Sequence, residues 1–176
     1  MAIRYWILMV LPVMSVSIAQ AAWQGKGQVE MTGEIIESAC AIHTDDVWQE
    51  IAFGIIPHRL IRSGGAGKSM EFSIRLVNCE LERANGGLWQ TAEITFDGES
   101  EPGHPDLFAV YGENKGIGLS IVDAAGHQAR PGVALPGIAL QPSSSTLYYQ
   151  MHVIHNGGDL IPGDWKSHIR FTVDYQ

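Results

Sequence analysis

Apolar and polar residues alternate one by one along much of the chain. The alternation is clearest in residues 72–76, 119–121, 147–153 and 169–175. Because successive side chains of a β-strand point to opposite faces, each of these segments offers one apolar face to a core. No segment after residue 21 keeps a helical period over three turns. The pattern therefore predicts an all-β protein.

Turn-forming residues separate the alternating segments. Clusters that contain glycine, several of them with proline, asparagine or aspartate, occur at 63–67, 85–87, 97–98, 102–103, 125–126, 131–132 and 156–158. Glycine accepts positive φ and proline presets the first corner of a turn. Short strands divided in this way are typical of an antiparallel sandwich or barrel. Segment 97–114 is the least regular, and we expect a long surface loop there.

The first 21 residues have the features of an export signal. Arg4 precedes an apolar run over residues 5–19, and residues 19–21 match the small-x-small pattern that a signal peptidase reads. The run is short for a membrane span and has few flanking charges. We expect residues 1–21 to be a signal peptide, with cleavage before Ala22 or directly after it. A retained anchor helix is the competing interpretation.

Residues 22–176 are enough for one domain with a core of its own. The whole chain has 11 basic and 19 acidic residues and a net charge of −8, and removal of Arg4 with the signal makes the rest more acidic. Nucleic acids and anionic membrane surfaces attract basic patches, and no basic run is present in the sequence. We therefore expect an exported acidic domain that does not bind nucleic acid.

Cys40 and Cys79 are the two cysteines of the chain, and both lie in the exported part. In an oxidising compartment, two thiols of one domain usually pair. A metal site is the alternative, but it would need further ligands at close spacing, which neither cysteine has nearby. We expect a Cys40–Cys79 disulfide and no metal.

The sequence patterns that suggest enzymes do not meet their own requirements. Residues 65–69 end like a phosphate-binding loop, but Arg62 occupies a position that must be glycine. His152 and His155 are three residues apart, so a strand would send them to opposite faces. We expect no catalytic residue, no cofactor and no small-molecule substrate. A secreted enzyme of sandwich fold remains a third hypothesis without an assigned site.

Two alternating segments lie near the ends of the exported part. Segment 27–36 has Gly33 within its apolar row, and a glycine inside a strand often marks close approach of another backbone. Segment 169–176 is an apolar strand pattern that runs to the last residue. Such a strand is a hazard at a sheet edge unless another segment covers it or pairs with it.

Taken together, these features resemble the pilin subunits of chaperone–usher fimbriae. Residues 27–35 followed by Cys40 are similar to the donor strand of that family, and residues 72–79 are similar to the strand with its second cysteine. Residues 115–121 and Gly126 are similar to its central strand and turn. The family also has a penultimate aromatic residue, here Tyr175, and a glycine fourteenth from the end, here Gly163.

The resemblance implies an incomplete immunoglobulin-like β-sandwich that lacks its final strand and is completed by a donor strand. Residues 22–37 would be the N-terminal donor segment and residues 38–176 the pilin domain. The implied groove-filling donors are Val29, Met31 and Ile35, with Gly33 kept small. The implied acceptor edge, which the chaperone meets first, consists of Gly163, Ile169, Phe171, Val173 and Tyr175. Pairing of a donor strand with such an edge is a form of β-augmentation.

The implied partners are a periplasmic fimbrial chaperone, an outer-membrane usher and neighbouring pilin subunits. The chain would pass through the periplasm to a cell-surface fimbria and support cell adhesion. Residues 46–51 and 171–175 are similar to the terminator subunit of P pili, so a minor or assembly-terminating subunit is favoured. The alternative is a single-domain tip adhesin that binds a host glycan through Trp89 or the loop around His104 and Tyr111.

Overall fold

The computed structural model describes residues 28–33, 37–62 and 68–176. The chain divides into two units, Met1–Ile35 and Ile36–Gln176. Within the first unit, residues 28–33 form neither helix nor strand. The predicted signal peptide, residues 1–21, lies outside the described residues. In the part that is described, no helix has the length and apolar character needed to cross a membrane.

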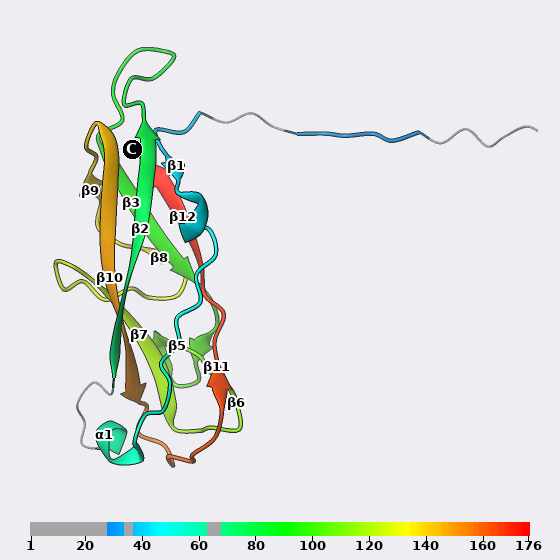
Figure 1. The fold of residues 1–176 in the computed structure, drawn as a ribbon, viewed down its shortest axis with the longest axis vertical. Coiled ribbons are helices and arrows are strands. Elements are labelled where there is room, and N and C mark those ends of the chain that lie inside the picture. Colours follow the sequence, from blue (N-terminus) through cyan, green and yellow to red (C-terminus); the bar gives the residue numbers. More distant parts are fainter. Residues whose placement is uncertain (1–27, 34–36, 63–67) are drawn as a thin grey trace, which may run out of the picture. The chain divides into compact units, whose positions relative to one another are not determined.

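The largest sheet of the second unit is antiparallel and has six strands (Figure 1). In spatial order, its strands are β1 (Ala41–Ile42), β2 (Ser69–Cys79), β10 (Ser143–His155), β7 (Ile117–Asp123), β5 (His104–Phe108) and β4 (Ser100–Glu101). The two long strands β2 and β10 pair over ten positions, from Ser143↔Cys79 to His152↔Ser69. Strand β7 overlaps the segment that was similar to the central strand of the family, and it begins at Ile117.

A second sheet is built on β12 and β3. In chain order, its strands are β3 (Thr91–Asp97), β8 (Val133–Ala134), β9 (Ile138–Ala139) and β12 (Arg170–Tyr175). A separate pair joins β6 (Tyr111–Gly112) to β11 (Trp165–Lys166). The other elements within residues 37–62 and 68–176 are two short helices, η1 (Thr44–Asp46) and α1 (His58–Arg62). Helix α1 lies at the opposite end of this unit from the C-terminus (Figure 1).

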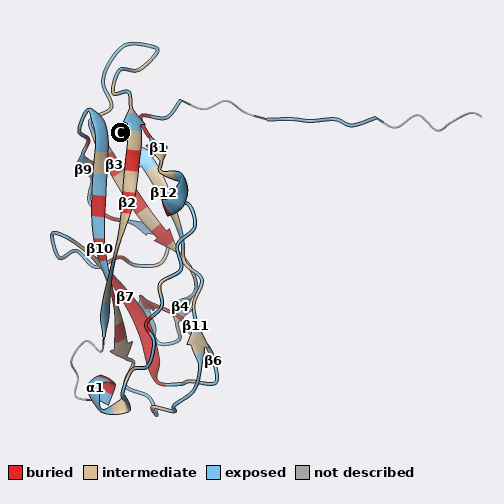
Figure 2. Cartoon of the chain, viewed as in Figure 1, coloured by how far each residue is buried: buried red, intermediate tan, exposed pale blue. Residues whose placement is uncertain are grey.

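The core lies between the two sheets and is made of apolar residues from both. Figure 2 shows where buried residues occur along the strands. Phe96 of β3 contacts Tyr149 of β10 with ring centroids 5.0 Å apart, and it also contacts Phe72 of β2 at 6.0 Å. The rows predicted from alternation are buried at Ile74, Leu76, Leu119, Ile121, Leu147, Tyr149, Met151 and Val153. The prediction of an all-β sandwich is therefore confirmed.

The prediction of a long surface loop over residues 97–114 is wrong. This segment contains β4, β5 and β6, and Leu107 and Phe108 at the end of β5 are both buried. Phe108 pairs with Leu119 of β7, which extends the large sheet. The alternation is absent because β5 begins with three exposed residues and ends with two consecutive buried ones. Contacts with β7, and not the local sequence pattern, therefore determine that residues 104–108 form a strand.

The disulfide between Cys40 and Cys79 is present, which confirms that prediction. It joins residues separated by 39 positions and ties the segment before β1 to the end of β2. Next to it, the backbone N–H of Glu80 donates to the carbonyl of Ala39 at 2.7 Å. The disulfide therefore fixes the point at which the N-terminal segment joins the sandwich.

Replacing both cysteines with serine is expected to lower the free energy of unfolding by about 3–4 kcal/mol, the entropy of closing a loop of roughly forty residues in the unfolded chain. The measurement is urea unfolding of the wild-type and variant proteins under oxidising conditions. Reduced wild-type protein is the matched control and should unfold at the same midpoint as the variant. Equal midpoints for the oxidised wild type and the variant would contradict the expected stabilisation.

Candidate functional site

An apolar groove of about 1130 Å³ runs along the second unit. One wall is the chain around residues 47–56, and the other is the chain from Gly163 to Phe171. Core side chains from both sheets line the space between the walls, namely Phe72, Phe96, Leu119, Ile121 and Met151. The groove is therefore an opening into the hydrophobic core between two segments that are far apart in sequence.

Strand β12 has a partner strand on one side only within the described residues. Gln176 and Thr91 exchange backbone hydrogen bonds, so even-numbered residues of β12 direct their N–H and C=O groups to β3. In an antiparallel ladder the residues between them direct these groups to the opposite side. The backbone groups of Phe171, Val173 and Tyr175 therefore face the free edge of the sheet.

The same odd-numbered residues carry the apolar side chains of this segment. Ile169, Phe171, Val173 and Tyr175 are half-buried and pack against the core, whereas Arg170, Thr172 and Asp174 are exposed. Ile169 and Phe171 line the groove, and Val173 and Tyr175 continue the row along β12. Four of the five predicted acceptor residues thus place apolar side chains along this edge, and among the described residues the backbone groups of the three that belong to β12 face no partner strand. Their role in binding another strand stays a prediction.

The opposite wall exposes large apolar side chains that the sequence did not identify as part of a site. Val47, Trp48 and Ile55 are 62%, 82% and 95% exposed. Residues 49–57 belong to no helix or strand, and no strand of the described part of the chain pairs with the backbone of this wall. The two walls come into contact at Phe53 and Trp165, whose ring centroids are 5.4 Å apart. The cluster of apolar residues at 47–56 is the sequence feature that could have indicated this wall.

Gly163 lies at the α1 end of the groove and must be glycine for a local steric reason. A Cβ atom at this position would lie 2.8 Å from the backbone nitrogen of Asn114 and from Cβ of Glu113. Nearby, Nε2 of His58 lies 3.2 Å from the carbonyl oxygen of Leu160, which connects α1 to the segment before Gly163. The glycine that the sequence singled out thus permits close packing against the chain that follows β6.

A buried carboxylate anchors the start of the 47–56 wall. Oδ2 of Asp46 accepts hydrogen bonds from the backbone N–H of Arg75 at 2.7 Å and from its Nε at 2.9 Å, and Oδ1 accepts from Nη2 at 2.8 Å. The hydrogen bond from the Arg75 side chain, opposed by burial, keeps the pKa of Asp46 below its usual value. The carboxylate is therefore ionised at neutral pH.

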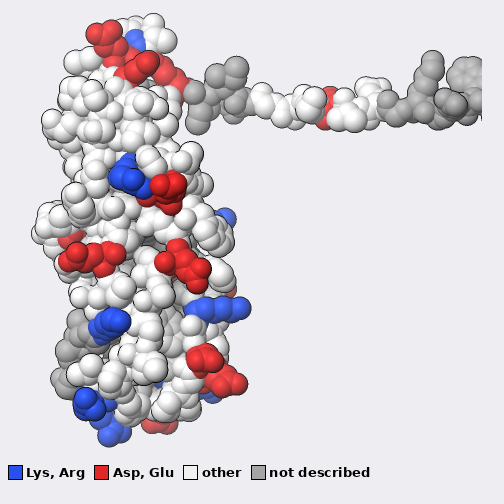
Figure 3. Space-filling model, viewed as in Figure 1, with Lys and Arg blue, Asp and Glu red and all other residues white. Residues whose placement is uncertain are grey.

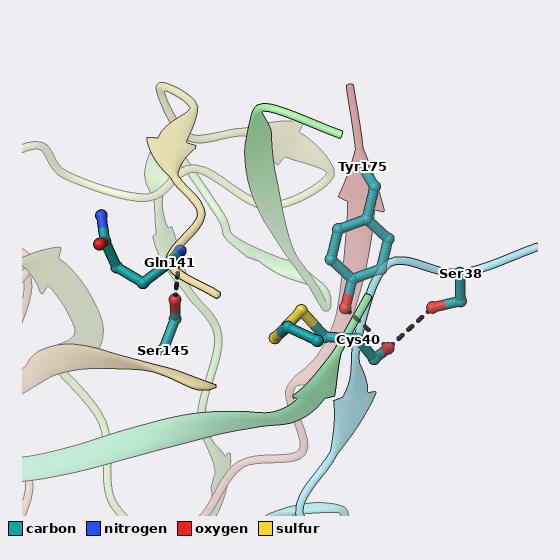
Figure 4. Close-up of a disulfide and its surroundings, with 6 residues drawn as sticks. Ser38, Cys40, Gln141, Ser145 and Tyr175 are labelled. Carbon is teal, nitrogen blue, oxygen red and sulfur yellow. Dashed lines mark hydrogen bonds between the residues drawn. A yellow bond between two sulfur atoms is a disulfide. The ribbon is translucent and has the colours of Figure 1, made fainter. Parts of the chain in front are cut away.

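Tyr175 connects β12 to the disulfide (Figure 4). Its hydroxyl donates to the carbonyl oxygen of Cys40 at 3.1 Å, and the hydroxyl of Ser38 donates to the same oxygen at 2.8 Å. Burial raises the pKa of Tyr175, so the hydroxyl keeps its proton and acts as a donor at neutral pH. The end of the predicted acceptor strand is thereby held against the segment that follows the predicted donor residues.

The predicted donor residues that the structure describes lie in the first unit, and they belong to no helix or strand. Val29 and Met31 are 83% and 89% exposed, and a Cβ atom on Gly33 would meet nothing within 4 Å. Ile35, the remaining predicted donor, lies outside the described residues. Exposed apolar side chains at alternate positions are compatible with donation to another molecule, but the role of these residues stays a prediction.

Two of the residues proposed for glycan binding, Trp89 and Tyr111, have other contacts. The guanidinium of Arg83 lies 3.7 Å from the ring centroid of Trp89, so it covers one face of the indole. The hydroxyl of Tyr111 donates to Glu99 at 2.6 Å. On the face shown in Figure 3, charged residues of both signs are scattered rather than gathered into one patch. Among the described residues, no group of three or more His, Cys, Asp or Glu side chains is placed to hold a metal ion.

Comparisons with known proteins agree over most of the chain. A family model described as "Fimbrial protein" matches residues 29–176. The PRS fimbrial minor pilin protein of Escherichia coli is 36% identical over 156 residues, which cover 88% of this chain and 78% of that protein. The Fimbria A protein of Serratia marcescens is 30% identical over 162 residues, covering 91% of this chain and 90% of that protein.

Two solved structures share the fold. The P pilus rod subunit PapA superposes with a TM-score of 0.71 at 25% identity, over 79% of this chain and all of that chain. A subunit from the structure of a chaperone–usher pilus superposes with a TM-score of 0.72 at 25% identity, over 90% of this chain and all of that chain. The predicted immunoglobulin-like pilin fold is therefore confirmed.

Proposed function

Since the chain belongs to the fimbrial protein family, we propose that it is a minor subunit of a chaperone–usher fimbria and is assembled by donor-strand exchange. The family consists of structural fibre proteins, so family membership confirms the expectation of a non-enzymatic protein at the cell surface. The observation that carries the proposal is the free edge of β12 beside an apolar groove.

In this proposal, an incoming strand pairs with β12 and covers the groove. The outward-facing N–H and C=O groups of Phe171, Val173 and Tyr175 supply main-chain hydrogen bonds, and the groove takes alternate apolar side chains of the incoming strand. Each apolar side chain that becomes fully buried contributes about 1.5–3 kcal/mol. A periplasmic chaperone supplies this strand first, before an outer-membrane usher passes the subunit into the fibre.

The chain in turn donates its own N-terminal segment to a neighbouring pilin. Val29, Met31 and Ile35 fill the groove of that neighbour, and Gly33 allows close approach of the two backbones. The exposure of Val29 and Met31 supports this role, because large apolar side chains on an extended segment gain stability only when a partner covers them. No covalent step and no cofactor are involved.

We assign the chain to the end of assembly because relatives with 36% identity are named minor pilins and because residues 46–51 and 171–175 are similar to the P-pilus terminator. A strain that lacks this subunit is expected to make longer fibres that detach more readily from the cell. Electron microscopy of fibre length and the amount of shed fibre in the medium measure both effects, and a strain with the gene restored is the control. Unchanged length and anchoring would contradict a terminating role.

A further inference from the structure

The edge of β2 changes its partner at the point where the groove begins. At Ala41 and Ile42, the edge pairs with β1 through backbone hydrogen bonds. One residue later, the backbone N–H of His43 donates to the carbonyl of Arg75 at 2.8 Å, and the chain then turns away through η1. Side chains continue the pairing in place of the backbone beyond this point.

Two polar side chains occupy the vacated edge. The carboxylate of Asp46 accepts from the backbone N–H of Arg75, as a strand carbonyl would. Two residues further along the same edge, the carbonyl of Ser73 accepts from Nε2 of Gln49 at 2.9 Å. Residues two apart on an antiparallel strand present their backbone groups to the same side, so these contacts extend the β1 ladder by two positions.

Because these side chains bond to the edge of β2, the backbone of the residues that follow is not paired with β2. Since side chains satisfy the edge of β2, residues 47–56 need not pair with it and line the groove instead. The turn that carries Val47 and Trp48 is at the same time fixed by the guanidinium of Arg75, which contacts both oxygens of the Asp46 carboxylate. Large exposed side chains on a fixed turn are suited to contact an incoming strand with little loss of entropy.

We propose that Asp46, Arg75 and Gln49 form a latch that positions the 47–56 wall to receive the strand that enters the groove. The inference rests on the proposed function and adds to it the residues that hold one wall open. Asp46 and Arg75 do not line the groove, so they are positioning residues that act through Val47, Trp48 and the residues after them. Replacing one member of a buried ion pair leaves the other member without its partner, which is destabilising. A single substitution is therefore enough to disrupt the latch.

The test uses Asp46→Asn, which keeps the shape of the side chain but turns an amide N–H₂ toward the Arg75 donors. The wild-type and variant chains are co-expressed with the chaperone of the same fimbrial system, and the purified complexes are compared by hydrogen exchange and by the rate of chaperone release. We expect exchange of the 47–56 amides and the release rate to rise about tenfold or more, with β10 amides unchanged. A loss of global stability alone would raise the exchange of β10 amides as well.

Asp106→Asn is the matched control, because it removes the carboxylate of an exposed Asp–Arg pair, Arg130 Nε to Asp106 Oδ1 at 2.8 Å, away from the groove. It should change neither measurement. If Asp46→Asn yields no soluble complex, Gln49→Leu is used, and a smaller change of the same kind is expected. Unchanged wall exchange, or equal increases in the wall and in β10, would overturn the latch. Failure of the wild type to bind a chaperone would instead contradict the proposed function, and exchange of the Arg75 amide, which donates to Asp46, would then decide the latch in the chain alone.

Discussion

Replacing Phe171 with aspartate is expected to reduce recovery of the chaperone-bound chain at least a hundredfold. Phe171 lines the groove, packs against the core with its ring 6.4 Å from that of Phe96, and presents its backbone groups to the free edge. A carboxylate here would be covered by the incoming strand without a partner, at a cost of several kcal/mol. About 1.4 kcal/mol corresponds to a factor of ten in binding. Affinity capture of a tagged chaperone from periplasmic extracts measures the recovery.

The neighbouring position provides a matched control. Thr172 is exposed on the other face of the same strand, so Thr172→Asp introduces the same charge and the same low strand propensity without entering the groove. It should leave recovery within a few-fold of wild type. Normal recovery of the Phe171→Asp variant would refute the proposed acceptor edge. Equal loss in both variants would show that β12 tolerates no aspartate and that the groove is not the cause.

The rows of side chains that form the core and the β12 edge were predictable from sequence, because alternation in a strand is a local property. The apolar face of residues 147–153 and of residues 169–175 can be identified without knowledge of the partner strand. The disulfide was predictable for a similar reason, since two cysteines in an exported chain leave a single intramolecular pairing. In each case the physical cause lies within the segment or in the composition.

The direction of the backbone groups was not predictable in this way. Whether odd or even residues of β12 face β3 depends on the register Tyr175↔Ala92, which joins residues far apart in sequence. The hydrogen bonds between Asp46 and Arg75 span 29 positions and have no local pattern either. The wall at 47–56 and strand β5 were missed because tertiary contacts place consecutive apolar residues there, without alternation. Long-range pairing thus determines the parts of the groove that the sequence left open.

Replacing Gly33 with leucine is expected to abolish donation to a neighbouring pilin while leaving chaperone binding intact. In the alternating row Val29, Met31, Gly33 and Ile35, a leucine at the third position would point into the groove of the acceptor, where the two backbones approach each other closely. Overpacking of this kind costs about 1–3 kcal/mol or more and shifts the register of the side chains around it. The measurements are incorporation into fibres, by immunoblot of sheared fibres, and recovery of the chaperone complex.

The two readouts are independent because replacing Gly33 creates no clash in the isolated chain. A Cβ atom at this position meets no other atom within 4 Å. Any loss must therefore arise when the segment enters another molecule. Thr32→Leu is the matched control, since it adds a leucine to the alternate row that faces away from the groove, and it should be incorporated normally. Loss of incorporation and of chaperone binding together in the Gly33→Leu variant would mean that the donor segment and the β12 edge do not have separate functions. Normal incorporation of the Gly33→Leu variant would contradict a role of Gly33 in the donor strand.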